Sequence, residues 1–247
     1  MPRLARLPLL TLSPLALLAA GCAATGGAAP ESGPAPAPAA TAPQGAGLAA
    51  FFNAYDAAQL SLSPVSKSFR GLRDADYGRW NPVGDEAQIA QEKLLQATAA
   101  GMRSSFALDT LSADEQLSVQ LFDDIARRSA ALFPYRNHGY IFDQMNGAHS
   151  QLPAFLINIH RVTTVAEAEA YISRLRGLGP QIDALSAESA RRFANGIQAP
   201  KWVYPYVISD IDNLSRSGRD MQLSGQTLLD DFRSKIAKLD ITPEQRQ

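Results

Sequence analysis

The spacing of the apolar side chains limits the fold most strongly. From residue 48 onward, apolar residues recur mostly at intervals of three and four positions, the period of an amphipathic helix, rather than at every second position, as in a strand. Strand-like runs are short and occur at Tyr140–Phe142 and Phe155–Ile159. We therefore expect an all-α fold, an array of amphipathic helices joined by short loops.

One helix is predicted from its capping residues. Ser112-Ala-Asp-Glu115 is a capping box, in which the serine hydroxyl and the glutamate carboxylate bind free amides of the first helical turn. Pro134 ends the segment, because proline has no amide hydrogen to donate. The apolar residues expected on the buried side of this helix are Leu117, Leu121, Ile125 and Leu132.

A second capping box, Thr164-Val-Ala-Glu167, predicts another helix that ends at Gly177 and Gly179. Pro180 suits the first turn of the next helix, which is expected to end at Asn195-Gly196. The residues expected to face inward in that helix are Ile182, Leu185 and Phe193. Weaker helical patterns cover residues 48–60, 86–105, 200–214 and 223–239.

Residues 1–21 have the organisation of a secretory signal peptide. Arg3 and Arg6 precede an apolar run from Leu7 to Ala20, and small residues follow. This run has 14 residues, whereas a transmembrane helix needs about 20. We expect a cleaved signal rather than a membrane span.

The end of this segment, Leu18-Ala-Ala-Gly-Cys22, resembles the bacterial lipobox, in which the cysteine receives a diacylglycerol and becomes the new N-terminus. Cys22 is the sole cysteine of the chain and is therefore the expected lipid attachment site. The alternative is an ordinary secretory signal with an incidental cysteine. Ala23, rather than Asp, follows the cysteine, which by resemblance to sorted lipoproteins indicates the outer membrane, facing the periplasm.

The segment after the cysteine, residues 22–47, is expected to be a disordered tether. Of its 26 residues, 20 are Ala, Pro or Gly, and Glu31 carries the only charge. Such a composition buries too little apolar surface to fold. The expected folded region is therefore 48–247.

The charge and cysteine content exclude several functions. The chain has 23 Lys and Arg against 24 Asp and Glu, a net charge of -1, so it lacks the basic field that nucleic-acid binding needs. One cysteine forms neither an intramolecular disulfide nor a cysteine-rich zinc site. The glycine-rich phosphate-binding motifs, the Gly-x-Ser-x-Gly motif and the His-Glu-x-x-His motif are all absent.

The best candidate site in the sequence is the polar stretch Phe142–Pro153, whose glycine, proline and hydrogen-bonding side chains are typical of a loop. This stretch contains His149, the second of three histidines that are spaced 11 residues apart, namely His138, His149 and His160. Three interpretations stay open for them: a metal site with Asp143, a substrate-lining role, or local hydrogen bonds. Asn146, His149 and His160 are our candidates for substrate-lining residues, and an ordinary loop is the alternative.

Two other patterns are interpreted as structural. Trp202, Tyr204 and Tyr206 alternate along the chain, and we favour ordinary packing over a binding strip. The carboxylate pairs Asp123-Asp124 and Asp230-Asp231 are expected to be solvated on helix surfaces.

Three segments carry a resemblance to a known family. They are Tyr140–His160 with its Asp-Gln-x-x-Gly-x-His pattern, Ala170–Leu175 with Tyr-x-x-Arg-Leu, and Gly196–Pro200. In this order they resemble the bacterial lipoproteins of domain-of-unknown-function family 885, and the similarity covers most of residues 48–247.

This resemblance implies a mostly helical protein of more than twice this length that is similar to zinc metallopeptidases. In such proteins a His-Glu-x-x-Pro-Gly-His signature toward the C-terminus supplies zinc ligands and the glutamate that activates water. No His-Glu pair occurs in this chain. We therefore assign it no catalytic residue, no metal ligand and no cofactor, and expect zinc in the longer family members.

The last residues agree with an N-terminal portion of a longer chain. Thr242-Pro243-Glu244-Gln245 has an N-cap, a proline for the first helical position and a capping-box glutamine, so a further helix is expected to begin here. The alternative is a C-terminus that frays.

Two functions follow. The first is the helical shell of a lipid-anchored, zinc-dependent peptidase, with one wall of the cleft for a peptide substrate. The second is a non-catalytic, lipid-anchored binding or scaffolding module. In both, the expected partner is the membrane, through the anchor, and nucleic acid is excluded.

Overall fold

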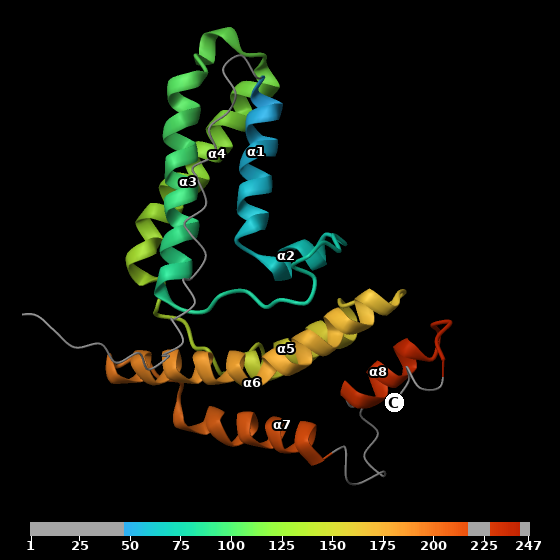
Figure 1. Ribbon diagram of the computed structural model, residues 1–247. Coiled ribbons are helices and arrows are strands. Elements are labelled where there is room, and N and C mark those ends of the chain that lie inside the picture. Colours follow the sequence, from blue (N-terminus) through green and yellow to red (C-terminus); the bar gives the residue numbers. More distant parts are fainter. Residues whose placement is uncertain (1–46, 217–227, 243–247) are drawn as a thin grey trace, which may run out of the picture. The chain divides into compact units, whose positions relative to one another are not determined.

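The computed structural model describes residues 47–216 and 228–242 (Figure 1), and its secondary structure in these ranges consists of helices alone. The all-α prediction is confirmed. The α-helices are α1 (Leu48–Ser61), α2 (Pro64–Phe69), α3 (Asp85–Ser105), α4 (Ala113–Leu132), α5 (Ala148–Asn158), α6 (Val165–Ala194), α7 (Tyr204–Arg216) and α8 (Leu228–Ile236). Three short 3₁₀ turns are η1 (Leu108–Thr110), η2 (Phe133–Tyr135) and η3 (Lys201–Val203).

Several predictions lie outside the described residues. These are the signal peptide, the lipid attachment at Cys22, the tether up to residue 46, and the helix start after Thr242. In the part that is described, no helix has both the length and the apolar character needed to cross a membrane.

Helices α1, α3 and α4 lie side by side (Figure 1) around one hydrophobic core. Its centre is formed by Phe51 of α1, by Ala99 and Met102 of α3, and by Phe122 and Ala126 of α4. Aromatic rings complete the contact between α1 and α4: the ring of Phe122 lies 5.2 Å from that of Phe52 and 5.0 Å from that of Tyr55, between ring centroids. These aromatic contacts, the second of which is edge to face, stabilise the packing of α1 on α4 beyond simple apolar burial.

The predicted start and end of α4 are confirmed, but its predicted buried side is wrong. Both halves of the Ser112–Glu115 capping box form, and α4 gives way to η2 at Phe133, next to Pro134. The side chains expected to be buried are 54% to 67% exposed: Leu117, Leu121, Ile125 and Leu132. The buried side carries Val119, Phe122 and Ala126 instead. This helix is apolar on two sides, and the aromatic contacts with α1 decide which side is buried.

A pair of charges joins the start of α3 to the turn after α4. The Arg136 guanidinium donates from Nε and Nη2 to the two carboxylate oxygens of Asp85, at 2.6 and 2.9 Å. This bidentate contact lowers the pKa of Asp85 to about 2. The carboxylate also lies in the first turn of α3, where the helix dipole favours a negative charge.

The second core surrounds α6 and contains buried polar side chains. Tyr171, Arg174 and His160 are each fully buried, next to the apolar residues Phe155 and Leu156. The Tyr-x-x-Arg-Leu pattern singled out in the sequence therefore contributes two residues to this core.

The prediction of two helices separated at Gly177, Gly179 and Pro180 is wrong, because α6 continues through all three. Gly177 is needed for close packing: a Cβ there would lie 3.0 Å from Cδ1 of Trp80, whose indole donates to the Arg174 carbonyl at 2.9 Å. Gly179 relieves the clash that a Cβ before a proline makes in helical conformation. At the end of α6, Phe193 is 58% exposed rather than buried.

Helix α8 packs on the second core through a buried carboxylate. Asp231 accepts hydrogen bonds from the Tyr171 hydroxyl at 3.0 Å and from Lys235 Nζ at 2.7 Å. Lys235 Nζ also donates to the carbonyls of Leu156 and Ile157 at the end of α5, at 2.6 and 3.0 Å. The prediction of a solvated pair at Asp230-Asp231 is thus wrong for Asp231, because α8 turns this side chain toward Tyr171.

Candidate functional site

A largely apolar cavity lies between α5, α6 and α7. Its volume is about 530 Å³, within the range of small-ligand sites. The chain segments 139–142 and 197–199 close its sides. Among the apolar side chains that line it are Phe142, Leu152, Ile182, Phe193, Val207 and Ile211.

His149 lines this cavity from the first turn of α5 and is only 4% exposed. Its Nε2 lies 3.4 Å from Oδ2 of Asp210 on α7, which is a long hydrogen bond. Its Nδ1 is buried and has no hydrogen-bond partner in the structure. A buried polar atom without a partner carries a free-energy cost, and such atoms are rare outside functional sites.

Gly147 makes room for the histidine. A Cβ at this position would lie 2.6 Å from both Cε1 and Nδ1 of the His149 ring, closer than atoms tolerate. The glycine of the Asp-Gln-x-x-Gly-x-His pattern is therefore required by space.

The aspartate of the same pattern stabilises the preceding turn. The Asp143 carboxylate accepts hydrogen bonds from the backbone amides of Met145 and Asn146, at 2.7 and 2.6 Å. The Asn146 side chain is exposed and lines neither of the two cavities described here.

The polar stretch Phe142–Pro153 was predicted to be a loop, but only its first part is irregular. Helix α5 begins at Ala148 and includes Pro153, and the strand-like run Phe155–Ile159 continues it up to Asn158. Packing against α6, α7 and α8 holds this helix. It tolerates a proline because the structure loses only one helical hydrogen bond there.

His160 lies in the second core and outside both cavities. Its Nδ1 accepts a hydrogen bond from Arg174 at 3.0 Å, so its protonated Nε2 faces the Glu167 carbonyl at 3.3 Å. Burial is the main reason that the pKa of His160 falls to about 4. The ring is therefore neutral at physiological pH and supports the core.

The structure does not bring the three histidines together. His138 is exposed and contacts the Tyr135 ring, His149 pairs with Asp210, and both nitrogens of His160 are occupied. In the described ranges, no three His, Cys, Asp or Glu side chains converge on a position that suits a metal.

Two charged side chains contribute to the cavity wall. Arg192 is fully engaged: its guanidinium donates to the Glu188 carboxylate at 2.9 Å and to the Gly139 carbonyl at 2.9 Å. Asp183 is exposed and forms no hydrogen bond or ion pair with any described residue. Asp183 is thus the charged side chain of the wall without a described partner, and Asp210, next to His149, has the same sign.

A second cavity, of about 490 Å³, lies on another side of α5, between α2 and α6. Its walls combine the rings of Phe69, Trp80 and Phe155 with the carboxamides of Gln151 and Asn158. The two cavities share Leu152.

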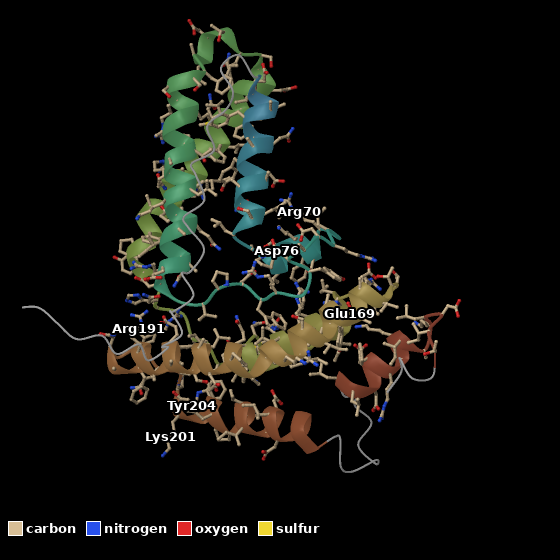
Figure 2. All side chains as sticks on the ribbon, viewed as in Figure 1. Arg70, Asp76, Glu169, Arg191, Lys201 and Tyr204 are labelled. Carbon is tan, nitrogen blue, oxygen red and sulfur yellow. The ribbon has the colours of Figure 1, made fainter. Side chains whose placement is uncertain are left out.

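The aromatic residues after α6 are not an alternating strip. Trp202 lies in η3, Tyr204 and Tyr206 lie in α7, and each of the three is at least 40% exposed. Tyr204 begins α7 next to α6 (Figure 2) and lines the first cavity. Trp202 and Tyr206 contact each other edge to face.

Residues 64–247 match the model of the family described as "Bacterial protein of unknown function (DUF885)". The chain belongs to this family. The DUF885 match contains both cavities, with α2 and α5 to α8, and begins after α1. No curated protein and no solved structure matches the chain.

Two carboxylates of the DUF885 site were not found from the sequence: Asp183, which lines the cavity, and Asp210, which contacts His149. Asp183 and Asp210 carry no motif, and each stands on an amphipathic helix as a surface carboxylate does. The spacing of Val203 in η3 and Val207 in α7 indicates a buried side at this point of the chain, but not that this side meets α5.

Proposed function

We propose that this chain is the helical, ligand-binding portion of a lipid-anchored cell-envelope protein. In this proposal the cavity between α5, α6 and α7 is one wall of a cleft for a peptide. The anchor is Cys22 with its diacylglycerol, and the helices face the periplasm from the outer membrane. Membership of the DUF885 family supports the proposal as far as the family goes, and the lipoprotein and zinc-peptidase parts rest on the resemblance described from the sequence.

One observation carries the binding role: a buried histidine with an unpaired Nδ1 lines a cavity of ligand size. Peptides suit such a wall, since apolar side chains fill an apolar cavity and polar groups of the backbone bind the few polar side chains around it. Of the three candidates from the sequence, His149 is the one that we retain for this role.

We assign peptide hydrolysis to a segment that these 247 residues do not contain. In the longer family members we propose that the His-Glu-x-x-Pro-Gly-His segment holds zinc, which polarises the peptide carbonyl and activates water. The residues of this chain would then position the peptide and exclude water from one side.

The second candidate is a non-catalytic binding or scaffolding module with the same anchor. The pairing of His149 with a single carboxylate favours it, because binding needs no metal. Extending the reading frame past Gln247 distinguishes the two functions, since the zinc signature is present only in the first.

Photo-cross-linking tests the peptide role. The full chain, solubilised from membranes, is irradiated with short peptides that contain benzoylphenylalanine, and the adducts are mapped by mass spectrometry. We expect adducts in α5, in the second half of α6 and in α7. Ser186→Phe should remove them, because it fills the cavity from an exposed position, whereas the distant Asp109→Asn should not. Adducts spread over α1, α3 and α4, or unaffected by Ser186→Phe, would contradict the proposal.

A further inference from the structure

The cavity has two chemical properties that together select a class of ligand. The first is its apolar wall, which is incompletely covered: Phe193 is 58% exposed, Ile211 46% and Tyr204 40%. Side chains of this size are exposed to water until a ligand covers them, and covering them is favourable.

The second property is the sign of the charge. On α6, the Arg192 guanidinium donates to the Gly139 carbonyl and to the Glu188 carboxylate, which Arg191 also contacts, so Arg192 is held by partners within the chain. Asp183 on α6 has no cationic partner among the described residues. The side chain of Asp210 on α7 is 48% exposed, and its described partner is His149, at the long distance of 3.4 Å. No described lysine or other arginine lines the cavity.

From these properties we infer that the cavity binds a hydrophobic residue that carries a free α-ammonium group, as at the N-terminus of a peptide. The apolar side chain enters between Leu152, Ile182 and Val207, and the ammonium group lies near the Asp183 carboxylate. The inference rests on the proposed function only in taking the amine to be that of a peptide.

The side chains that line the cavity also predict which ligands bind weakly. An anionic ligand meets uncompensated negative charge and gains no ion pair. A small cation without an apolar group leaves the exposed rings uncovered. Acetylation of the amine removes the attraction to Asp183 but keeps the hydrophobic contact.

Four small probes test the inference by calorimetric titration of the full chain at about pH 6.5, where an α-amino group is protonated. They are phenylalanine amide, its N-acetyl derivative, N-acetylphenylalanine and glycine amide. We expect phenylalanine amide to bind about three- to fivefold more tightly than its N-acetyl derivative, as for one partly exposed ion pair. The anion and glycine amide should bind more weakly than both.

Variants test whether Asp183 causes the preference for the free amine. Asp183→Asn should abolish the preference for the free amine while leaving binding of the N-acetyl derivative unchanged. Asp109→Asn, which neutralises an exposed carboxylate of η1, is the matched control and should keep the preference. Ser186→Phe should weaken the binding of both phenylalanine amide and its N-acetyl derivative.

Equal affinity for the free and acetylated amides in the wild-type chain, or a preference that survives Asp183→Asn, would overturn the inference. The two proposals fail separately. Binding of phenylalanine amide that depends on Asp183, without peptide adducts, retains the amine site and rejects the peptide wall. Peptide adducts without a preference for the amine do the reverse.

Discussion

Arg174 shows how a single residue organises the second core. Its guanidinium is fully buried and donates to the Arg79 carbonyl, the Ser68 hydroxyl and Nδ1 of His160, at 2.9 to 3.1 Å. The ring of Phe155 lies 4.7 Å away and adds a cation–π contact. Burial lowers the pKa of Arg174 to about 10, so the side chain stays charged at neutral pH. Its donation to Nδ1 requires a neutral His160.

This arrangement predicts how stability depends on pH. The pKa of His160 is about 4 in the folded chain and 6.5 for a free side chain, so the unfolded chain binds the proton first. The stability that His160 contributes is complete above pH 6.5 and is lost as the pH falls toward 4. Urea unfolding of the wild-type chain should show a midpoint that falls across this window.

The variant His160→Gln is the comparison. It should be less stable at neutral pH, since glutamine does not reproduce both hydrogen bonds, and its midpoint should fall less between pH 6.5 and about 4.5. Carboxylates contribute mainly below this window, because their ordinary pKa values lie near 4. Identical pH profiles for the two proteins would show that His160 is not the buried neutral group described here.

Individual residues also show how much of the site could be predicted from the sequence. His149 and the Gly147 and Asp143 around it follow from a dense polar pattern. Asp183 and Asp210 could not be predicted, because the position of Asp183 at the cavity and the contact of Asp210 with His149 depend on which helices pack together. Neither could the burial of Asp231, whose neighbour Tyr171 lies 60 residues earlier.

Among the helices, the capping residues predicted where helices begin, whereas the apolar spacing did not predict which side of α4 is buried. The box at Ser112 forms in full because it needs only neighbouring residues. At Thr164 only one half forms: the Thr164 hydroxyl accepts from the Glu167 amide, whereas the Glu167 carboxylate accepts from the amide of Thr163, at 2.6 Å, rather than from that of Thr164. The buried side of α4 depends on α1, which lies more than 50 residues earlier.

The continuity of α6 yields a second prediction. Pro180 cannot donate to the Arg176 carbonyl, so Pro180→Ala should stabilise the chain by roughly 1–3 kcal/mol. Gly179→Ala should gain nothing while Pro180 is present, because its Cβ meets the proline ring. In the Pro180→Ala background the same change should gain about 1 kcal/mol.

A double-mutant cycle by urea unfolding measures this coupling. Additive effects of the two substitutions would contradict the role given to Gly179.

At the scale of the whole molecule, the predicted anchor has a direct test. If Cys22 is lipidated, the wild-type protein fractionates with membranes, and multiple acyl chains hold it there stably. Cys22→Ala should leave the protein unprocessed or release it into the soluble fraction. Normal cleavage and unchanged membrane binding of this variant would point to another means of attachment.

The fold class could be predicted at this scale because helical periodicity is a local property repeated along the chain. The arrangement could not, since α4 is apolar on two sides and periodicity does not choose between them. The exposed leucines of α4 are a consequence of that choice.

We propose that these helices bind a ligand without forming a catalytic metal centre of their own. The most direct measurement is the zinc content and peptidase activity of the purified 247-residue chain, assayed alongside peptide cross-linking. We predict adducts at the cavity, no stoichiometric zinc and no hydrolysis, because His149 pairs with one carboxylate and His160 with Arg174. One zinc per chain, with chelator-sensitive hydrolysis that His149→Ala abolishes, would contradict this account and place an active site at the start of α5.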